Sequence, residues 1–236
     1  TFDDGPYDPW TEMILDSLKA LGVHATFFVI GQNADREPDL VQRMWEDGHE
    51  IGNHTFTHPN LGECSLARTR LELVATQRSI EAILGRSTRL FRPPYNADAE
   101  PTSAEEVRPI EIASDLGYLT VGEYLDPQDW ELREETPEGH TRLRTAADIA
   151  KSVIDDVHSG HGNTILLHDG GGDRSRTAAS LRLFVARLRA EGFAFVTISQ
   201  LLRTTRLRTM PPINPRDDIL IGGDRIAFNT LYGIES

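Results

Sequence analysis

The stretch Ala25-Thr26-Phe27-Phe28-Val29-Ile30 is a continuous apolar run of strand length, and it predicts a buried strand. Before it, residues 9–21 carry apolar side chains at helical spacing and end at Gly22, a natural helix stop. After it, residues 38–46 predict a second helix and residues 50–52 a short strand. Since the chain opens on what resembles the end of a strand, the order up to here is β, α, β, α, β.

The same alternation continues along the chain. We predict strands at residues 89–91, 118–121, 163–167 and 193–198, and helices at residues 65–84, 107–116, 146–157 and 174–190, with a last short helix capped by Ser199. Strands that alternate with helices of this length favour parallel strands joined by right-handed crossovers. The sequence therefore predicts an α/β fold, either an open sheet or a closed barrel.

The length of 236 residues suits one compact domain, because α/β barrels of this size fold as a unit. We expect the catalytic domain at residues 1–205 and a C-terminal tail or linker at 206–236, where Pro211, Pro212 and Pro215 interrupt any periodicity. Residues 131–144 also lack periodicity and predict a loop at the rim of the site. Because the chain begins at a strand end, we expect it to be cut from a longer protein.

The charge balance limits the classes of partner. The chain has 37 acidic and 24 basic residues, a net charge of −13, which argues against nucleic acid because phosphate binding depends on basic residues. A neutral or cationic ligand fits better. Cys64 is the single cysteine, so no disulfide forms within the chain and cysteine usage does not fix the compartment. No apolar stretch is long enough to span a membrane.

The strongest chemical signal combines Thr1-Phe2-Asp3-Asp4-Gly5-Pro6 with His54-Thr55-Phe56-Thr57-His58. Two adjacent carboxylates and two histidines four residues apart form an oxygen and imidazole set that suits a divalent metal such as zinc. One carboxylate is then left over to act as a base. Each motif also has a plainer interpretation. The first motif is compatible with an Asp-Asp-Gly-Pro turn, which can be present together with a metal site, and the second with a pair of histidines at the surface.

Three further motifs carry polar residues. Two of them, at Arg92 and His168, lie at or just past the end of a predicted strand, where polar residues meet at the carboxyl end of a parallel sheet. Arg92-Pro93-Pro94-Tyr95 holds an arginine and a tyrosine on a stiff backbone, and Asp126-Pro127-Gln128-Asp129-Trp130 sets a carboxylate beside an aromatic ring. Leu166-Leu167-His168 ends a buried strand with a histidine that a neighbouring carboxylate could make a competent acid. Ordinary core or surface roles for these residues remain alternatives. We interpret the other histidines as structural or solvated.

Taken in order, these five motifs resemble those of the polysaccharide deacetylase family, also called NodB-homology domains or family 4 carbohydrate esterases. The resemblance spans Thr1 to His168 and implies a distorted (β/α) barrel of seven or eight strands in a single domain. It also implies one divalent metal ion, most often Zn²⁺, with Co²⁺, Ni²⁺ or Mn²⁺ as alternatives. The stretch Leu167–Ser175 is similar to that of a subgroup fused to a membrane glycosyltransferase, which agrees with a chain cut from a larger, membrane-associated protein.

The resemblance implies a role for each matching residue. Asp4, His54 and His58 hold the metal, Asp3 is the general base, and His168 is the acid that protonates the departing amine. Arg92 keeps Asp3 ionised and Asp129 orients and charges His168. The substrate residues are implied as the Tyr95 backbone N–H, which stabilises the oxyanion, and a small acetyl pocket made by Trp130 and Leu166.

The resemblance implies metal-dependent removal of N-acetyl groups from a glycan that contains N-acetylglucosamine, such as a chitin-like glycan, exopolysaccharide or peptidoglycan, outside the cytoplasm. Three alternatives stay open. The same groups would serve an O-acetyl ester such as acetylxylan, and a related amidohydrolase would act on small cyclic amides. A catalytically silent glycan-binding barrel is the third, although Asp3, Asp4, His54, His58 and His168 are all present.

Overall fold

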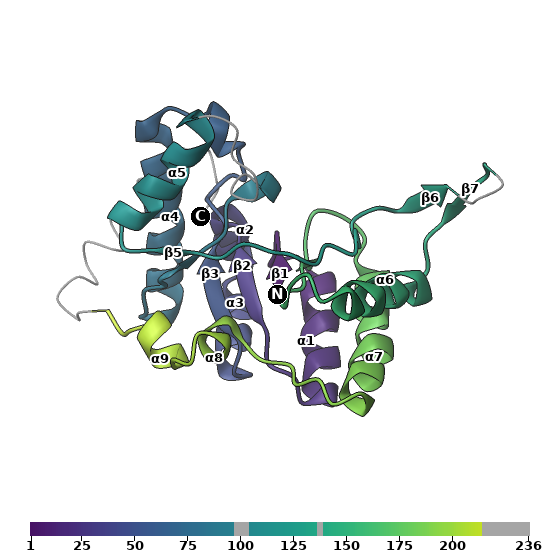
Figure 1. Cartoon of the computed structure of the whole chain (residues 1–236). Helices are drawn as coiled ribbons and strands as arrows, with labels where there is room; N and C mark the ends of the chain where they lie inside the picture. The colour runs from purple at the N-terminus through teal and green to yellow at the C-terminus, as the bar shows by residue number, and fades with distance from the viewer. Residues whose placement is uncertain (97–103, 136–138, 214–236) are drawn as a thin grey trace.

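A computed structural model describes residues 1–96, 104–135 and 139–213. Its centre is a parallel sheet of six strands in the order β5-β4-β3-β2-β1-β8, with helices packed around it (Figure 1). The strands are β1 (Phe2–Asp3), β2 (Thr26–Val29), β3 (Glu50–Asn53), β4 (Leu90–Phe91), β5 (Leu119–Thr120) and β8 (Leu167–His168). The predicted α/β fold in a single domain is therefore confirmed.

The segment after β5 joins the two edges of this sheet. Val121 directly follows the edge strand β5 and its N–H donates to the Phe91 carbonyl of β4, and a few residues later Leu125 forms a parallel bridge with Ile165, just before β8, at the other edge. One stretch of chain thus runs from one edge of the sheet to the other, which closes the sheet into a distorted barrel. The sheet has six strands in the described residues rather than seven or eight.

The helices follow the strands in chain order. They are α1 (Trp10–Leu21), α2 (Gly31–Arg36), α3 (Pro38–Glu46), α4 (Leu66–Leu84), α5 (Ala104–Asp115), α6 (Ala146–Ser159), α7 (Ser175–Ala190), α8 (Ile198–Leu201) and α9 (Arg206–Thr209), with 3-10 turns at Leu61–Glu63 and Pro94–Asn96. Side chains define several starts: Ser65 caps α4, and Thr145 forms a capping box with Asp148 at α6. Gly22 ends α1 in the left-handed conformation.

The main core lies between the sheet and helices α1, α3, α6 and α7. Phe27 is fully buried and stacks on Phe2 with ring centroids 5.0 Å apart, while Ile14 from α1 and Phe184 from α7 belong to the same cluster. The predicted strand around Phe27 is thus the centre of the core, as its apolar sequence requires. This packing fixes the strand ends that carry the site.

Three predictions of local structure were wrong. Residues 193–198 form no strand, because the Thr26 hydroxyl accepts the Ile198 N–H and Glu50 accepts the Thr197 hydroxyl in place of ladder bonds. Thr197, not Ser199, caps the helix that follows. The predicted loop at 131–144 contains an antiparallel hairpin, β6 (Arg133–Glu135) and β7 (Thr141–Leu143), which projects from the barrel in Figure 1.

Part of the predicted tail contacts the barrel. The N–H groups of Ser87 and Arg89 donate to the carbonyls of Pro211 and Thr209, so residues 209–211 run alongside the chain that leads into β4. Residues 214–236 lie outside the described residues, and the domain boundary at 206 stays a prediction. No helix within the described ranges combines the length and apolar character that crossing a membrane requires.

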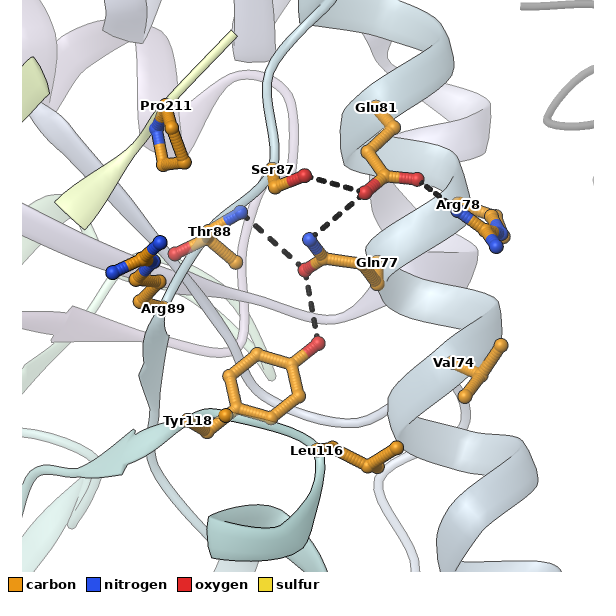
Figure 2. Close-up of a pocket in the computed structure, with 11 residues that line it drawn as sticks. Val74, Gln77, Arg78, Glu81, Ser87, Thr88, Arg89, Leu116, Tyr118 and Pro211 are labelled. Carbon is orange, nitrogen blue, oxygen red and sulfur yellow. Dashed lines mark hydrogen bonds and ion pairs between the residues drawn. The ribbon is translucent and has the colours of Figure 1, made fainter. Parts of the chain in front are cut away.

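A polar network between α4 and strands β4 and β5 lines a groove of about 590 Å³ (Figure 2). The Tyr118 hydroxyl donates to Gln77 Oε1 at 2.9 Å, and Gln77 Nε2 donates to Glu81 at 3.1 Å. The same hydroxyl accepts a 2.9 Å bond from Asn53 Nδ2, and Asn53 Oδ1 accepts the Thr55 N–H. Burial raises the pKa of Tyr118, so the phenol stays protonated. The network therefore supports the start of the loop that carries His54.

Candidate active site

The predicted site residues converge at the carboxyl ends of the strands. Asp3 is the last residue of β1 and His168 that of β8, while His54 follows β3 and Arg92 follows β4. These residues line one cavity of about 450 Å³ together with Asp4, His58, Pro93, Tyr95, Glu123, Asp126, Trp130 and Leu166. Of the ten predicted site residues, nine line this cavity, and Asp129 contacts it through His168.

Asp4, His54 and His58 form the group of potential metal ligands found in the described residues. Asp4 Oδ1 lies 3.2 Å from His58 Nε2 and 3.5 Å from His54 Nε2, and the three ligand atoms lie within 4.8 Å of one another. His54 Nδ1 lies 2.8 Å from the Arg92 carbonyl, which fixes the ring and directs Nε2 at Asp4. One carboxylate and two imidazoles in this arrangement fit a catalytic zinc-type site.

The backbone at these ligands is unusual. Asp4, Thr55 and His58 have φ angles of 76°, 67° and 58°, in the left-handed region that non-glycine residues rarely adopt. Side chains hold these conformations: Asn33 Nδ2 donates to the Asp4 carbonyl at 2.8 Å, and Thr55 Oγ1 accepts the His58 N–H at 3.1 Å. Strain of this kind clusters at functional sites.

The loop between the two histidines is tied to helix α4. Glu72, fully buried in that helix, accepts the N–H groups of Phe56 and Thr57, both at 2.8 Å. Phe56 is itself fully buried. The loop geometry is therefore set by a helix as well as by its own sequence, which a motif alone does not reveal.

The electrostatics favour positive charge at this place. Burial alone would raise the pKa of Asp4, but hydrogen bonds from His54 and His58 outweigh it and bring the pKa well below its usual range. For His54, burial would lower the pKa, but the carboxylates of Asp3 and Asp4 raise it above its ordinary value. Such a field stabilises a bound cation.

Arg92 connects the base candidate to the barrel wall. Its guanidinium is 1% exposed, and Nη1 donates to Asp3 Oδ1 at 2.8 Å and to Thr1 Oγ1 at 2.9 Å. Nε donates to the Val121 carbonyl at 3.0 Å, in the segment that closes the barrel. Asp3 Oδ2 lies 3.8 Å from His54 Nε2. Arg92 therefore fixes the carboxylate of Asp3 next to the metal ligands.

His168 and Asp129 form a buried pair. Burial would lower the pKa of His168, but its hydrogen bond and charge interaction with Asp129 raise it to about 9. His168 is therefore an imidazolium at neutral pH. Thr177 Oγ1 donates to Asp129 Oδ2 at 2.7 Å and holds the carboxylate in place.

The three residues with a predicted substrate role all line this cavity. Tyr95 has a φ of 61° and is 67% exposed, with its ring centroid 4.7 Å from that of His58. Trp130 is 44% exposed, while Leu166 is buried in the wall of the same cavity. An exposed aromatic face beside a small apolar wall suits a sugar ring with an acetyl group.

Sequence reasoning missed several residues that support the site. Glu123 lines the cavity, with its Oε2 3.6 Å from Arg92 Nε. Its position just after β5 could have identified it as a site residue, because the site lies at the carboxyl ends of the strands. Asp169 is fully buried; it accepts the Gly5 N–H at 3.1 Å and the Thr11 hydroxyl at 2.6 Å. Burial raises the pKa of Asp169 to about 7. It holds the turn that presents Asp4.

Comparison with known proteins agrees with this geometry. The family model described as polysaccharide deacetylase matches residues 1–121, slightly more than half of the chain. The chain belongs to the polysaccharide deacetylase family. This domain is 36% identical over 207 residues to a peptidoglycan-N-acetylglucosamine deacetylase of Bacillus cereus, with 86% of each chain covered. It is 33% identical over 206 residues to a chitooligosaccharide deacetylase of Azorhizobium caulinodans, covering 82% of this chain and 89% of the relative.

Solved structures of the family share the fold. A peptidoglycan N-acetylglucosamine deacetylase bound to a naphthalenyl N-oxidanyl-benzamide superposes with a TM-score of 0.74 at 30% identity, covering 87% of each chain. A family 4 acetyl xylan esterase from Clostridium thermocellum, in complex with cobalt, gives 0.70 at 30% identity over 87% of this chain and 91% of its own. A family pseudoenzyme from Bacillus anthracis gives 0.69 at 26% identity over 85% and 63%. The shared fold thus hosts different acetyl substrates and an inactive relative.

Proposed function

We propose that this deacetylase domain hydrolyses N-acetyl groups of N-acetylglucosamine units in a polymeric or oligomeric glycan, releasing acetate with the help of one divalent metal ion. The observation that carries the proposal is that Asp3, the Asp4, His54 and His58 cluster, and His168 line one cavity. A base, a cation site and a protonated acid around one space are what amide hydrolysis near neutral pH needs.

Asp4, His54 and His58 would hold the metal, for which Zn²⁺ suits the donor set and Co²⁺ occurs in one relative. When bound, the metal supplies Lewis acidity that acidifies water and polarises the acetyl carbonyl. The pairing of His54 Nδ1 with the Arg92 carbonyl sets the tautomer in which Nε2 is free to act as a ligand.

The side chains of this domain then move the protons. Asp3, held by Arg92, accepts a proton from the attacking water as the water oxygen bonds to the acetyl carbon. His168, kept charged by Asp129, gives its Nε2 proton to the amide nitrogen as the carbon–nitrogen bond breaks. The products are acetate and an amine on the sugar.

The remaining residues position the substrate. The Tyr95 backbone N–H would donate to the developing oxyanion, and its strained φ of 61° keeps that N–H in one orientation. Trp130 and Leu166 would enclose the acetyl methyl group. Glu123 and Asp126 add carboxyl groups to the same wall, which favours a neutral acetyl sugar, whose product is a cationic amine, over a polyanion.

The relatives suggest the substrate and its place. Peptidoglycan and chitooligosaccharide are named as substrates of proteins similar to this chain, and peptidoglycan lies outside the cytoplasmic membrane. We therefore propose that the domain works in an extracytoplasmic compartment, on a glycan of this class.

The test is acetate release from acetylated chitooligosaccharides and from peptidoglycan, with and without a chelator, followed by addition of zinc. Release that the chelator abolishes and zinc restores is expected. An absence of release from a sample that contains stoichiometric metal would overturn the proposal. Turnover of acetylxylan by the same sample would then identify an O-acetyl esterase. Inactivity on all three substrates would point to a small cyclic amide as substrate or to a silent binding domain.

A further inference from the structure

The C-terminal part of the described chain has a charge opposite to that of the whole protein. Residues 192–213 contain three arginines and no acidic residue, in a chain whose net charge is −13. They also hold a third or so of the exposed large apolar side chains in the described residues: Phe193, Val196, Leu201, Leu202 and Leu207 are 39% to 60% exposed. Basic and apolar side chains are thus interleaved on one short stretch.

This stretch lies at the end of the barrel opposite the active site. Figure 1 shows α8 and α9 at the bottom of the molecule, whereas the arrowhead of β1, which carries Asp3, points to the top. We name the side chains Leu201, Leu202, Arg203, Leu207 and Arg208, with the neighbouring Arg89, the basal patch. Arg89 is included because it is exposed and its backbone lies beside this stretch, with its N–H donating to the Thr209 carbonyl at 2.8 Å.

The patch rests on a rigid base. Arg206 lies 3.6 Å from the ring centroid of Trp45, and its Nη1 donates to the carbonyls of Trp45 and His49, both at 2.9 Å. This arginine therefore anchors α9 to the barrel. Arg203 and Arg208 remain exposed, and in the described part of the chain neither has an ion-pair partner. Within the described ranges, no carboxylate neutralises these two guanidinium groups.

The composition of the patch selects the partner. Exposed leucines beside arginines are typical of surfaces that lie in the interface of an anionic membrane, where the apolar groups enter the acyl boundary and the guanidinium groups meet phosphates. Val196 and Leu201 also line an apolar cavity of about 320 Å³, so the apolar surface continues inward. A protein of net charge −13 is repelled by an anionic bilayer except through such a local basic surface.

We propose that the basal patch docks this domain on the surface of a membrane that contains anionic phospholipids. Docking through this end leaves the mouth of the active site facing away from the bilayer. The proposal is independent of the catalytic function, since no residue of the patch lines the active-site cavity.

The experiment is co-sedimentation of the protein with vesicles of phosphatidylcholine and phosphatidylglycerol, and with vesicles of phosphatidylcholine alone. We expect binding to the mixed vesicles that weakens as salt rises, and much weaker binding to the neutral ones. The double variant Arg203→Gln and Arg208→Gln should lower the affinity about tenfold or more, because each basic residue near the surface contributes on its own. The pair Leu202→Gln and Leu207→Gln should also weaken binding.

The matched control is the double variant Arg70→Gln and Arg182→Gln, which removes the same charge from exposed positions on α4 and α7. It should bind the mixed vesicles like the parent protein, and both arginine variants should release acetate from a soluble chitooligosaccharide at the parent rate. Equal binding to both kinds of vesicle, or an equal loss in the control, would overturn the proposal. So would a dimer in sedimentation velocity that the leucine variant converts to a monomer, because the patch would then bind a second copy.

Discussion

His168 and Asp129 are joined twice: His168 Nδ1 lies 2.7 Å from Asp129 Oδ1, and the His168 backbone N–H donates to Asp129 Oδ2 at 3.0 Å. The side chain of Asp129 is fully buried, and that of His168 is 13% exposed. A single carboxylate thus sets both the position of the strand end and the charge of the imidazole. Asp129 therefore supports both the end of β8 and the charge of the proposed acid, His168.

Replacing Asp129 should therefore change the pH dependence of activity. The raised pKa of His168, about 9, keeps the acid protonated up to that pH, so activity should fall as pH rises through it. In Asp129→Asn the pKa of His168 should drop, because burial lowers it and the largest of the interactions that raise it is gone, although the charges of Asp3 and Asp4 remain. The alkaline limb of kcat/KM should move to lower pH, with a loss of about 10²-fold or more at neutral pH.

The control for this variant is Thr177→Val, which removes a hydrogen bond to Asp129 Oδ2 but leaves its charge. Its alkaline limb should stay near that of the parent. If Asp129→Asn keeps the alkaline limb of the parent enzyme, His168 is not the acid that the pH profile reports.

Asp3→Asn should separate catalysis from metal binding. The amide keeps the shape of the side chain but cannot take a proton, and a general base is typically worth roughly 10² to 10⁴ in rate. We expect turnover to fall by about 10² or more while metal content after dialysis stays that of the parent. Near-normal turnover would show that another group is the base.

The fold and the site were predictable from sequence to different extents. The buried run around Phe27 and the regular alternation of helices and strands identified the parallel sheet, because a short continuous apolar run is typical of a strand buried on both faces. The stretch at Phe193 had the same apolar character, yet the segment that follows it bonds to the side chains of Thr26 and Glu50. Those partners lie 147 or more positions away along the chain, and no local pattern encodes them.

The cluster of potential metal ligands was also only partly predictable from the sequence. Residue types and strand ends predicted that the Asp3-Asp4 pair would meet His54 and His58, and the family resemblance implied Asp4 as the ligand. Neither predicted how the positive φ angles of Asp4 and His58 are maintained. Asn33 and Thr55 bond to the backbone of Asp4 and His58, and Glu72 in the middle of α4 and Asp169 after β8 hold the two loops that carry them. A glutamate in a helix and an aspartate after a histidine are common on surfaces, so only the folded chain reveals their part.

His49 should make the protein sensitive to acid. His49 is 1% exposed, and its Nδ1 accepts the Ala25 N–H at 3.1 Å. Burial, and to a smaller extent the charge of His24, lowers the pKa of His49 to about 4. The unfolded chain, with the ordinary pKa of 6.5, binds a proton first, so stability is lost as pH falls below 6.5 towards 4. Between pH 7 and pH 5 this costs about 2 kcal/mol.

Urea unfolding at both pH values checks this. His49→Gln can still accept the Ala25 N–H, so its free energy of unfolding should depend less on pH, whereas the exposed His161→Gln should behave like the parent protein. An unchanged pH dependence in His49→Gln would assign the acid sensitivity to other groups.

His54→Ala should lower metal affinity rather than merely slow the reaction. His54 supplies one of the three ligand atoms of this cluster, and the alanine side chain has no donor atom to replace Nε2. Asp3, whose Oδ2 lies 3.8 Å from Nε2, is held in place by Arg92. We expect the metal content after dialysis to fall well below stoichiometric, while the parent and His161→Ala keep theirs. Excess zinc should restore only part of the lost acetate release, since a site with two protein ligands binds weakly and holds the ion less firmly. Full metal occupancy in His54→Ala after dialysis would mean that the ion binds elsewhere. The assignment of Asp4, His54 and His58 as the metal ligands would then be wrong.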